Sequence, residues 1–151
     1  MKLTILGCHA ATPRTISHTT SQVLETRGHC FLIDCGEGTQ IELRRNKIKF
    51  NQIKNIFISH LHGDHYFGLI GLISTFRLLK REKPLNIFAP KGLKKIIDLH
   101  LKISNSKINF QLNIIELQSN ISECIFDDSK ISVYNIPLKH RIYTNGYLFK
   151  E

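Results

Sequence analysis

Residues 60–65 read His-Leu-His-Gly-Asp-His and directly follow an apolar run, 55–59, that is typical of a buried strand. Side chains two residues apart on a strand share a face, so His60 and His62 are able to offer two imidazoles to one ion. With 8 His in 151 residues, three His and one Asp at these offsets arise by chance in about one chain in a thousand. The chain is therefore expected to fold with a metal site at the end of this strand.

Residues 63–65, the second half of this six-residue motif, indicate a second metal position. Gly63 permits a sharp turn, after which Asp64 and His65 point toward a neighbouring position. The alternative is that the histidines only cap a helix. That alternative does not explain why four ionisable groups crowd together where they would repel one another when protonated.

Hydrophobic periodicity predicts strands first and then alternating strands and helices, as in an α/β fold. We expect one domain over residues 1–151, with no repeat or linker. The expected strands are 2–7, 21–26, 29–34, 55–59, 85–89, 110–117, 131–138 and 143–149. The expected helices are a half-exposed one at 40–45, one that begins at or near Asp64, and an amphipathic one at 91–101.

Cysteine usage and hydropathy bear on the compartment. The four cysteines, Cys8, Cys30, Cys35 and Cys124, form no C-x-x-C pair, so we expect reduced and mostly buried thiols. The N-terminal apolar stretch is too short for a secretory signal, and no run approaches the roughly 20 apolar residues of a spanning helix. A cytoplasmic location is expected.

The formal charge of +9, from 21 Lys plus Arg against 12 Asp plus Glu, favours a polyanionic partner such as nucleic acid. The basic residues gather in four runs at 44–49, 77–83, 91–95 and 139–141. Taken singly, each run is more often a solvated helix end or loop than a binding site.

The pattern H-x-H-x-D-H after an apolar strand resembles the signature of the metallo-β-lactamase superfamily. Within it the chain is similar to the ribonuclease Z family, and the similarity covers nearly the whole sequence. The matching stretches are 6–13, 20–21, the segment Asp-Cys-Gly-Glu-Gly-Thr-Gln at 34–40, 56–65, 68–72, the turn at Gly92, and His140 followed by Gly146-Tyr147. The 34–40 segment and the surroundings of His140 favour this family over other members of the superfamily.

The resemblance implies an αββα sandwich, of which this chain supplies mainly the first sheet and its helices. It also implies that His60, His62 and His140 hold one zinc ion, and that Asp64 and His65 hold a second. Asp64 would serve as the general base as well, and Asp34 would orient the ligand loop. Without the resemblance, His140 would more often be a plain strand-end histidine.

By the same resemblance the activity is that of a zinc-dependent endoribonuclease, a homodimer, that removes the 3′ trailer from precursor tRNA. Two zinc ions lower the pKa of a bridging water toward about 7, so hydroxide is available for attack on a phosphodiester. Family members run to roughly twice this length, so a bridging aspartate, a last histidine and a protruding tRNA-binding arm have no counterpart here. The domain is therefore expected to be incomplete at its C-terminus, with five of seven ligands. Cys8 and His9 depart from the family pattern and are expected to be loop residues.

Two other functions stay open at this point. One is a different hydrolase of the superfamily, acting on small esters, thioesters or lactams. The other is a catalytically incomplete fragment that binds metal or RNA. Cleavage of a precursor tRNA, turnover of a chromogenic lactam or thioester, and RNA binding without cleavage would distinguish the three.

Overall fold

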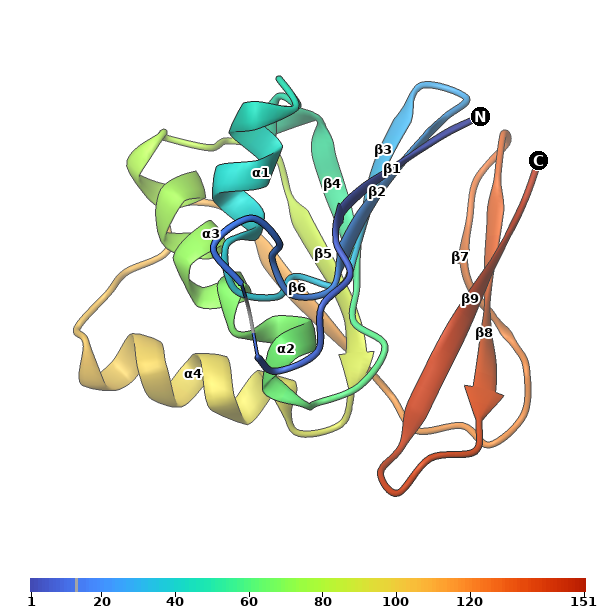
Figure 1. The fold of residues 1–151 in the computed structure, drawn as a ribbon. Helices are drawn as coiled ribbons and strands as arrows, with labels where there is room; N and C mark the ends of the chain where they lie inside the picture. Colours follow the sequence, from blue (N-terminus) through green and yellow to red (C-terminus); the bar gives the residue numbers. More distant parts are fainter. Residues whose placement is uncertain (13) are drawn as a thin grey trace.

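The computed structural model describes residues 1–12 and 14–151, so the Pro13 end of the 6–13 stretch lies outside the described residues. The strands are β1 (Lys2–Gly7), β2 (Ser21–Thr26), β3 (His29–Ile33), β4 (Ile53–Phe57), β5 (Leu85–Pro90), β6 (Leu112–Leu117), β7 (Cys124–Asp127), β8 (Ser132–Leu138) and β9 (Thr144–Lys150). The helices are α1 (Thr39–Arg45), a short 3₁₀ turn (Phe50–Gln52), α2 (Gly63–Tyr66), α3 (Gly68–Leu78) and α4 (Leu93–Ile103). Figure 1 shows their arrangement.

Strands β1 to β6 form one sheet in sequence order. The first three are antiparallel neighbours, and β3, β4, β5 and β6 are parallel. In the parallel part, the helical segments carry the chain from the end of one strand to the start of the next. Because the carboxyl ends of parallel strands meet at one edge, the loops after β3, β4 and β5 gather there.

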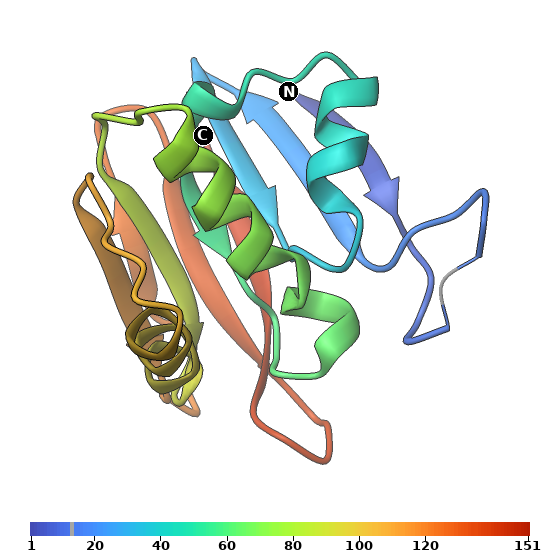
Figure 2. The same ribbon diagram turned by 90° about the vertical axis from the view of Figure 1, so that its left-hand side faces the viewer.

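Helices α1 to α4 all cover one face of this sheet (Figure 2). Their apolar sides meet inward-facing sheet residues in a core that includes Leu43 of α1, Phe76 of α3 and Ile97 of α4. The half-exposed helix expected at 40–45 is confirmed as α1, with Leu43 fully buried. This packing holds the carboxyl edge of the sheet on a rigid support.

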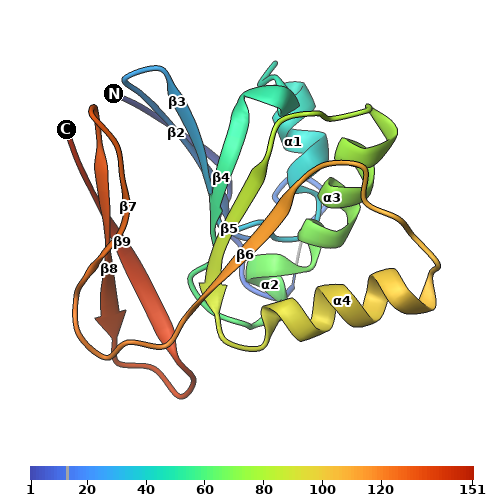
Figure 3. The ribbon, with the colours of Figure 1, turned by 180° about the vertical axis from the view of Figure 1, so that it is seen from behind.

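The other face of the sheet packs on a second, antiparallel sheet of order β7-β8-β9 (Figure 3). The interface is aromatic: Phe57 stacks on Phe88 with ring centroids 4.8 Å apart, and Phe31 and Phe149 lie 5.2 Å apart. The described residues thus form helix, sheet and sheet layers, as expected for the first part of an αββα sandwich. No helix among residues 1–12 and 14–151 covers the outer face of the second sheet, where Leu138 and Leu148 are exposed.

Several expected boundaries need correction. The strand expected at 55–59 is β4 and ends at Phe57, so the histidines lie in a turn rather than on the strand. The helix expected from Asp64 is interrupted at Phe67, which is 63% exposed rather than buried, and continues as α3. Strand β7 was not expected at all.

The cysteine prediction is half right. All four thiols are free, but only Cys30 and Cys35 are buried, while Cys8 and Cys124 are exposed. Cys8 and His9 follow β1 in the connection to β2, as expected for loop residues. Within the described part of the chain, no helix is long and apolar enough to cross a membrane.

The aromatic interface gives a stability prediction. Replacing the fully buried Phe57 by Ala should cost about 3–5 kcal/mol of unfolding free energy, because the lost ring leaves a cavity between the two sheets. The matched change Phe67→Ala, on a ring that is 63% exposed, should cost less than about 1 kcal/mol. Urea denaturation followed by circular dichroism measures both, and equal losses would contradict this account of the interface.

Candidate metal centre

The centre is built around the buried carboxylate of Asp34, one residue beyond β3. Asp34 accepts hydrogen bonds from the Ser59 backbone N–H at 2.7 Å and from the Ser59 hydroxyl at 2.9 Å. Nδ1 of His65 lies 2.7 Å from its second oxygen. The backbone of Asp34 has φ 57°, a left-handed conformation that Asp tolerates better than most residues. One carboxylate therefore joins the ends of β3 and β4 to the turn that carries the histidines.

Close backbone approach requires glycine at Gly36 and at Gly68. Cys35 N–H donates to the His65 carbonyl at 2.8 Å, and Gly68 N–H donates to the Cys35 carbonyl at 3.0 Å. A Cβ at Gly36 would collide with the Asp64 carbonyl, and a Cβ at Gly68 with the Gly36 carbonyl. Any side chain at either position would force the two turns apart.

His60, His62 and His140 come together although His140 is 78 residues from His62. One nitrogen from each ring lies within 4.8 Å of the other two. The ring centroids are 4.7 Å apart for His60 and His62, and 5.0 Å apart for His60 and His140. The structure thus places His140 beside His60 and His62, the two residues with which the family resemblance groups it.

Two hydrogen bonds between the sheets place the His140 loop. Asn145 N–H of β9 donates to the Ser59 carbonyl at 2.9 Å. The Tyr147 hydroxyl donates to the Ile58 carbonyl at 2.6 Å. Burial, with the nearby Asp34 charge next, raises the pKa of Tyr147 well above its usual value, so the hydroxyl keeps the proton that it donates.

Asp64 and His65 lie beside the three-histidine cluster as a separate pair. Nε2 of His65 is 3.3 Å from an Asp64 carboxylate oxygen, and the His60 and His65 ring centroids are 3.9 Å apart. Because Nδ1 of His65 faces Asp34, the proton belongs on that nitrogen, and the Nε2 lone pair is left for another partner. The structure brings together all five residues that the sequence indicated.

The electrostatics of the centre favour the neutral imidazole at His60 and His62, but not at His65. Burial, followed by the neighbouring His65 and His62, lowers the pKa of His60 from 6.5 to about 4. Desolvation, followed by the Arg141 guanidinium, also lowers the pKa of His62. Burial works to lower the pKa of His65 as well, but the hydrogen bond and charge of Asp34 outweigh it, and this pKa is raised.

Two residues of the centre were missed in the sequence. Ser59 contributes its hydroxyl, which lies 3.0 Å from Nδ1 of His60 and donates to Asp34. Arg141 donates from Nε to Nε2 of His62 at 3.2 Å. The only signal for Arg141 was its place in the basic run 139–141, a run that taken alone indicates a solvated loop.

The donor set fits a zinc-like ion. Tetrahedral zinc holds imidazole nitrogens at about 2.0–2.1 Å, which places them about 3.3 Å from one another. Nε2 of His140 and Nδ1 of His62 are 3.4 Å apart, and one nitrogen of each of the three rings lies within 4.8 Å of the other two, so the cluster is already near this spacing. The low pKa of His60 keeps its imidazole neutral, which is the form that binds a metal.

Two face-to-face sheets, helices on one outer face and a cluster of three histidines at the sheet edge define a protein of the metallo-β-lactamase fold. A family model described as Anti-Pycsar protein Apyc1 matches residues 1–140, and the chain belongs to that family.

Curated relatives support the resemblance to ribonuclease Z. Ribonuclease Z of *Bacteroides thetaiotaomicron* is 47% identical over 150 residues, which are 99% of this chain and 48% of that protein. Ribonuclease Z of *Bacteroides fragilis* is 45% identical over 150 residues, 99% of this chain and 49% of that protein. The chain spans about half the length of the curated relatives it matches.

Solved structures show the same similarity. Human tRNase Z, short form, superposes with a TM-score of 0.89 at 36% identity, over 100% of this chain and 65% of that one. The metallo-β-lactamase fold protein YhfI of *Bacillus subtilis* superposes with a TM-score of 0.71 at 16% identity, over 98% of this chain and 58% of that one. The first resembles the chain in sequence and fold, and the second in fold alone.

The pKa of His60 predicts how stability depends on pH in the metal-free chain. Between pH 6.5 and about 4 the unfolded chain binds a proton at His60 that the folded chain does not, so folding weakens as the pH falls through this window. The change His60→Gln should remove part of this slope, while His100→Gln, an exposed change on α4, should leave it. Urea denaturation at several pH values measures the slopes, and the same slope in all three proteins would refute the assignment.

Proposed function

We propose that the chain is the metal-binding part of a zinc-dependent endoribonuclease that removes the 3′ trailer from precursor tRNA. The observation that carries the proposal is its 47% identity over 150 residues with a protein named ribonuclease Z. The gathering of the three histidines at the sheet edge supports it, because this is the part of such a protein that would hold the metal.

In this proposal His60, His62 and His140 hold one zinc ion, and Asp64 and His65 hold a second. When bound, the ions supply Lewis acidity to a phosphodiester and make hydroxide available near neutral pH. The chain's own contribution is rigidity, because Asp34 and Ser59 fix the ligand turn through hydrogen bonds.

Two side chains would act on the substrate directly. Asp64, half-buried beside His65, would take the proton from the attacking water as general base. The guanidinium of Arg141, exposed at the edge of the cluster, would donate hydrogen bonds to a phosphate oxygen. The net charge of +9 favours RNA, recognised mainly through its phosphates and shape.

The remaining parts of the proposal rest on the ribonuclease Z resemblance. They are a homodimeric assembly, a cytoplasmic location, and one metallo-β-lactamase-fold domain over residues 1–151 whose active site needs further ligands. Full cleavage activity would then require those ligands, with little activity in the 151 residues alone.

A second candidate is a different hydrolase of this fold. It is favoured by the family model, whose description is Anti-Pycsar protein rather than ribonuclease Z. A third candidate is a fragment that binds metal or RNA without catalysis. Both are outcomes of the cleavage experiment below.

The role of Asp34 predicts a metal-affinity effect. Asp34→Asn should weaken zinc binding by about 10- to 100-fold, because the amide cannot accept from both Ser59 and His65 as the carboxylate does. The matched change Asp98→Asn, on the exposed side of α4, should leave the affinity unchanged. Isothermal titration with zinc measures both, and circular dichroism verifies that each variant is folded. Equal affinities in folded variants would exclude this role.

The cleavage prediction needs the remaining ligands. We would join this chain to the portion of the *Bacteroides thetaiotaomicron* ribonuclease Z that it does not match. The zinc-loaded hybrid should release the 3′ trailer of a precursor tRNA. Asp64→Asn should lower the rate about 10²- to 10⁴-fold, as expected for the loss of a general base, while Asp98→Asn should not.

The same hybrid distinguishes the other candidates. Turnover of a chromogenic lactam, a thioester or a small phosphodiester without tRNA cleavage would establish the second candidate. A folded hybrid that binds RNA and cleaves none of these substrates would establish the third. Either result would overturn the proposed function.

A further inference from the structure

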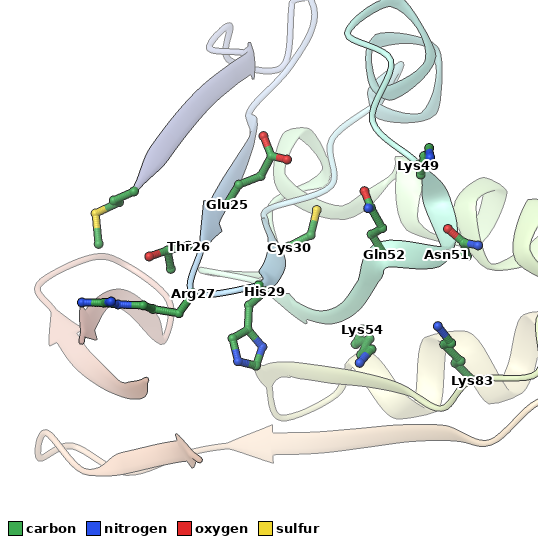
Figure 4. Close-up of a pocket in the computed structure, with 12 residues that line it drawn as sticks. Glu25, Thr26, Arg27, His29, Cys30, Lys49, Asn51, Gln52, Lys54 and Lys83 are labelled. Atoms are coloured by element: carbon green, nitrogen blue, oxygen red, sulfur yellow. The ribbon is translucent and has the colours of Figure 1, made fainter. Parts of the chain in front are cut away.

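A polar pocket of about 740 Å³, shown in Figure 4, opens beside the start of β4, and the histidine cluster follows the other end of that strand. Its lining comes from the β2–β3 hairpin, from residues 49–54 around the start of β4, and from Lys83 before β5. The histidines follow the other end of β4, a strand of five residues that spans about 17 Å. The pocket is therefore separate from the candidate metal centre.

The pocket is strongly cationic. Four of its lining residues are Arg27, Lys49, Lys54 and Lys83, against one carboxylate, Glu25. Lys2 lies 3.1 Å from Glu25 and neutralises it. Burial raises the pKa of the Cys30 thiol, also in the lining, to about 11, so this thiol adds no negative charge.

The three lysines lack acidic partners. Arg27 pairs with Glu151 at 3.0 Å, but no carboxylate in residues 1–12 and 14–151 lies within 4.0 Å of Lys49, Lys54 or Lys83. Lys49 and Lys83 end two basic runs that are separate in the sequence, and Lys54 adds a third charge from β4. The fold thus brings three lysine side chains to one pocket, and no carboxylate of the described residues pairs with them.

Hydrogen bonds from Arg81 hold the backbone at Lys83 in place. Arg81, only 6% exposed, donates from Nε to the Lys83 carbonyl at 2.7 Å and from a terminal nitrogen to the Pro84 carbonyl at 2.8 Å. Its guanidinium lies 4.7 Å from the Phe76 ring centroid. The other terminal nitrogen is buried without a hydrogen-bond partner among the described residues, and an adjoining pocket of about 200 Å³ is lined by Arg81, Lys83, Lys80 and one carboxylate, Glu82, among others. Arg81 therefore adds a further cation behind Lys83, with no carboxylate of the described residues within 4.0 Å of its guanidinium.

We propose that this pocket is a second phosphate-binding site, in which Lys49, Lys54 and Lys83 bind the phosphate groups of a ligand with two or more such groups. The side-chain amides of Asn51 and Gln52, which line the same wall, supply neutral donors to the same oxygens. An oligophosphate or the backbone of single-stranded RNA presents this chemistry. The site requires no metal and no cleavage, so it stands or falls independently of the proposed function.

The test is a nuclear magnetic resonance titration of the ¹⁵N-labelled chain, with a chelator present to remove metals. Inorganic pyrophosphate and a single-stranded RNA of about ten nucleotides are added separately, since each protein site for such RNA covers about 4–16 nucleotides. Amide signals of residues 49–54 and 81–83 should shift, and the affinity should fall as salt is raised.

Two double variants carry the same loss of charge. Lys54→Gln with Lys83→Gln should weaken binding about tenfold or more, because it removes charge-assisted hydrogen bonds inside the pocket. Lys95→Gln with Lys102→Gln, on exposed positions of α4, should change the affinity less than about twofold. Both pairs are exposed, so the variants are expected to fold.

Each result of the titration supports or contradicts the proposed phosphate-binding site. Binding of pyrophosphate at these residues supports a site for free oligophosphates, and binding of RNA alone supports a site for the RNA backbone. Equal weakening in the two double variants would show diffuse surface charge only and overturn the proposal. So would shifts confined to residues 60–65 and 140, or no shift with either ligand at millimolar concentration.

Discussion

The buried carboxylate of Asp34 is the interaction on which the rest of the centre depends. At 4% exposure it is costly to bury, and its cost is offset by donors from Ser59 and His65. Because those donors belong to the turn after β4, satisfying the carboxylate fixes that turn. Without it, three histidines and an aspartate would sit on a mobile loop, and the mutual repulsion of the histidines when protonated would oppose their gathering.

The second constraint is the contact between the two sheets. His140 is exposed in the loop that joins β8 to β9 of the second sheet, so its distance from His60 is set by how that sheet docks. Aromatic packing around Phe57 supplies the attraction, and the hydrogen bonds from Asn145 and Tyr147 set the alignment beside Ser59. The stability of the sheet interface and the geometry of the candidate metal centre are therefore coupled. A substitution that weakens the packing between the two sheets should also displace His140.

The sequence predicts the local part of this arrangement well, because ligand spacing and strand periodicity are local properties. It places β4 two residues too far along, since the apolar run continues past the last sheet residue, Phe57. It misses β7, whose four residues include the exposed Cys124 and Asp127 and show little apolar periodicity. It also misses Arg141 and the basic pocket, because both depend on contacts between segments that are far apart along the chain. His140 was found through family resemblance and not through spacing.

The central claim is that His60, His62 and His140 form one metal site held in place by the Asp34 carboxylate. Anomalous diffraction from zinc-soaked crystals, collected on both sides of the zinc absorption edge, tests it most directly. The account predicts an anomalous peak bonded to one nitrogen of each of the three rings, with His65 still hydrogen-bonded to Asp34. A peak on other residues, or no peak at the three histidines under saturating zinc, would contradict it.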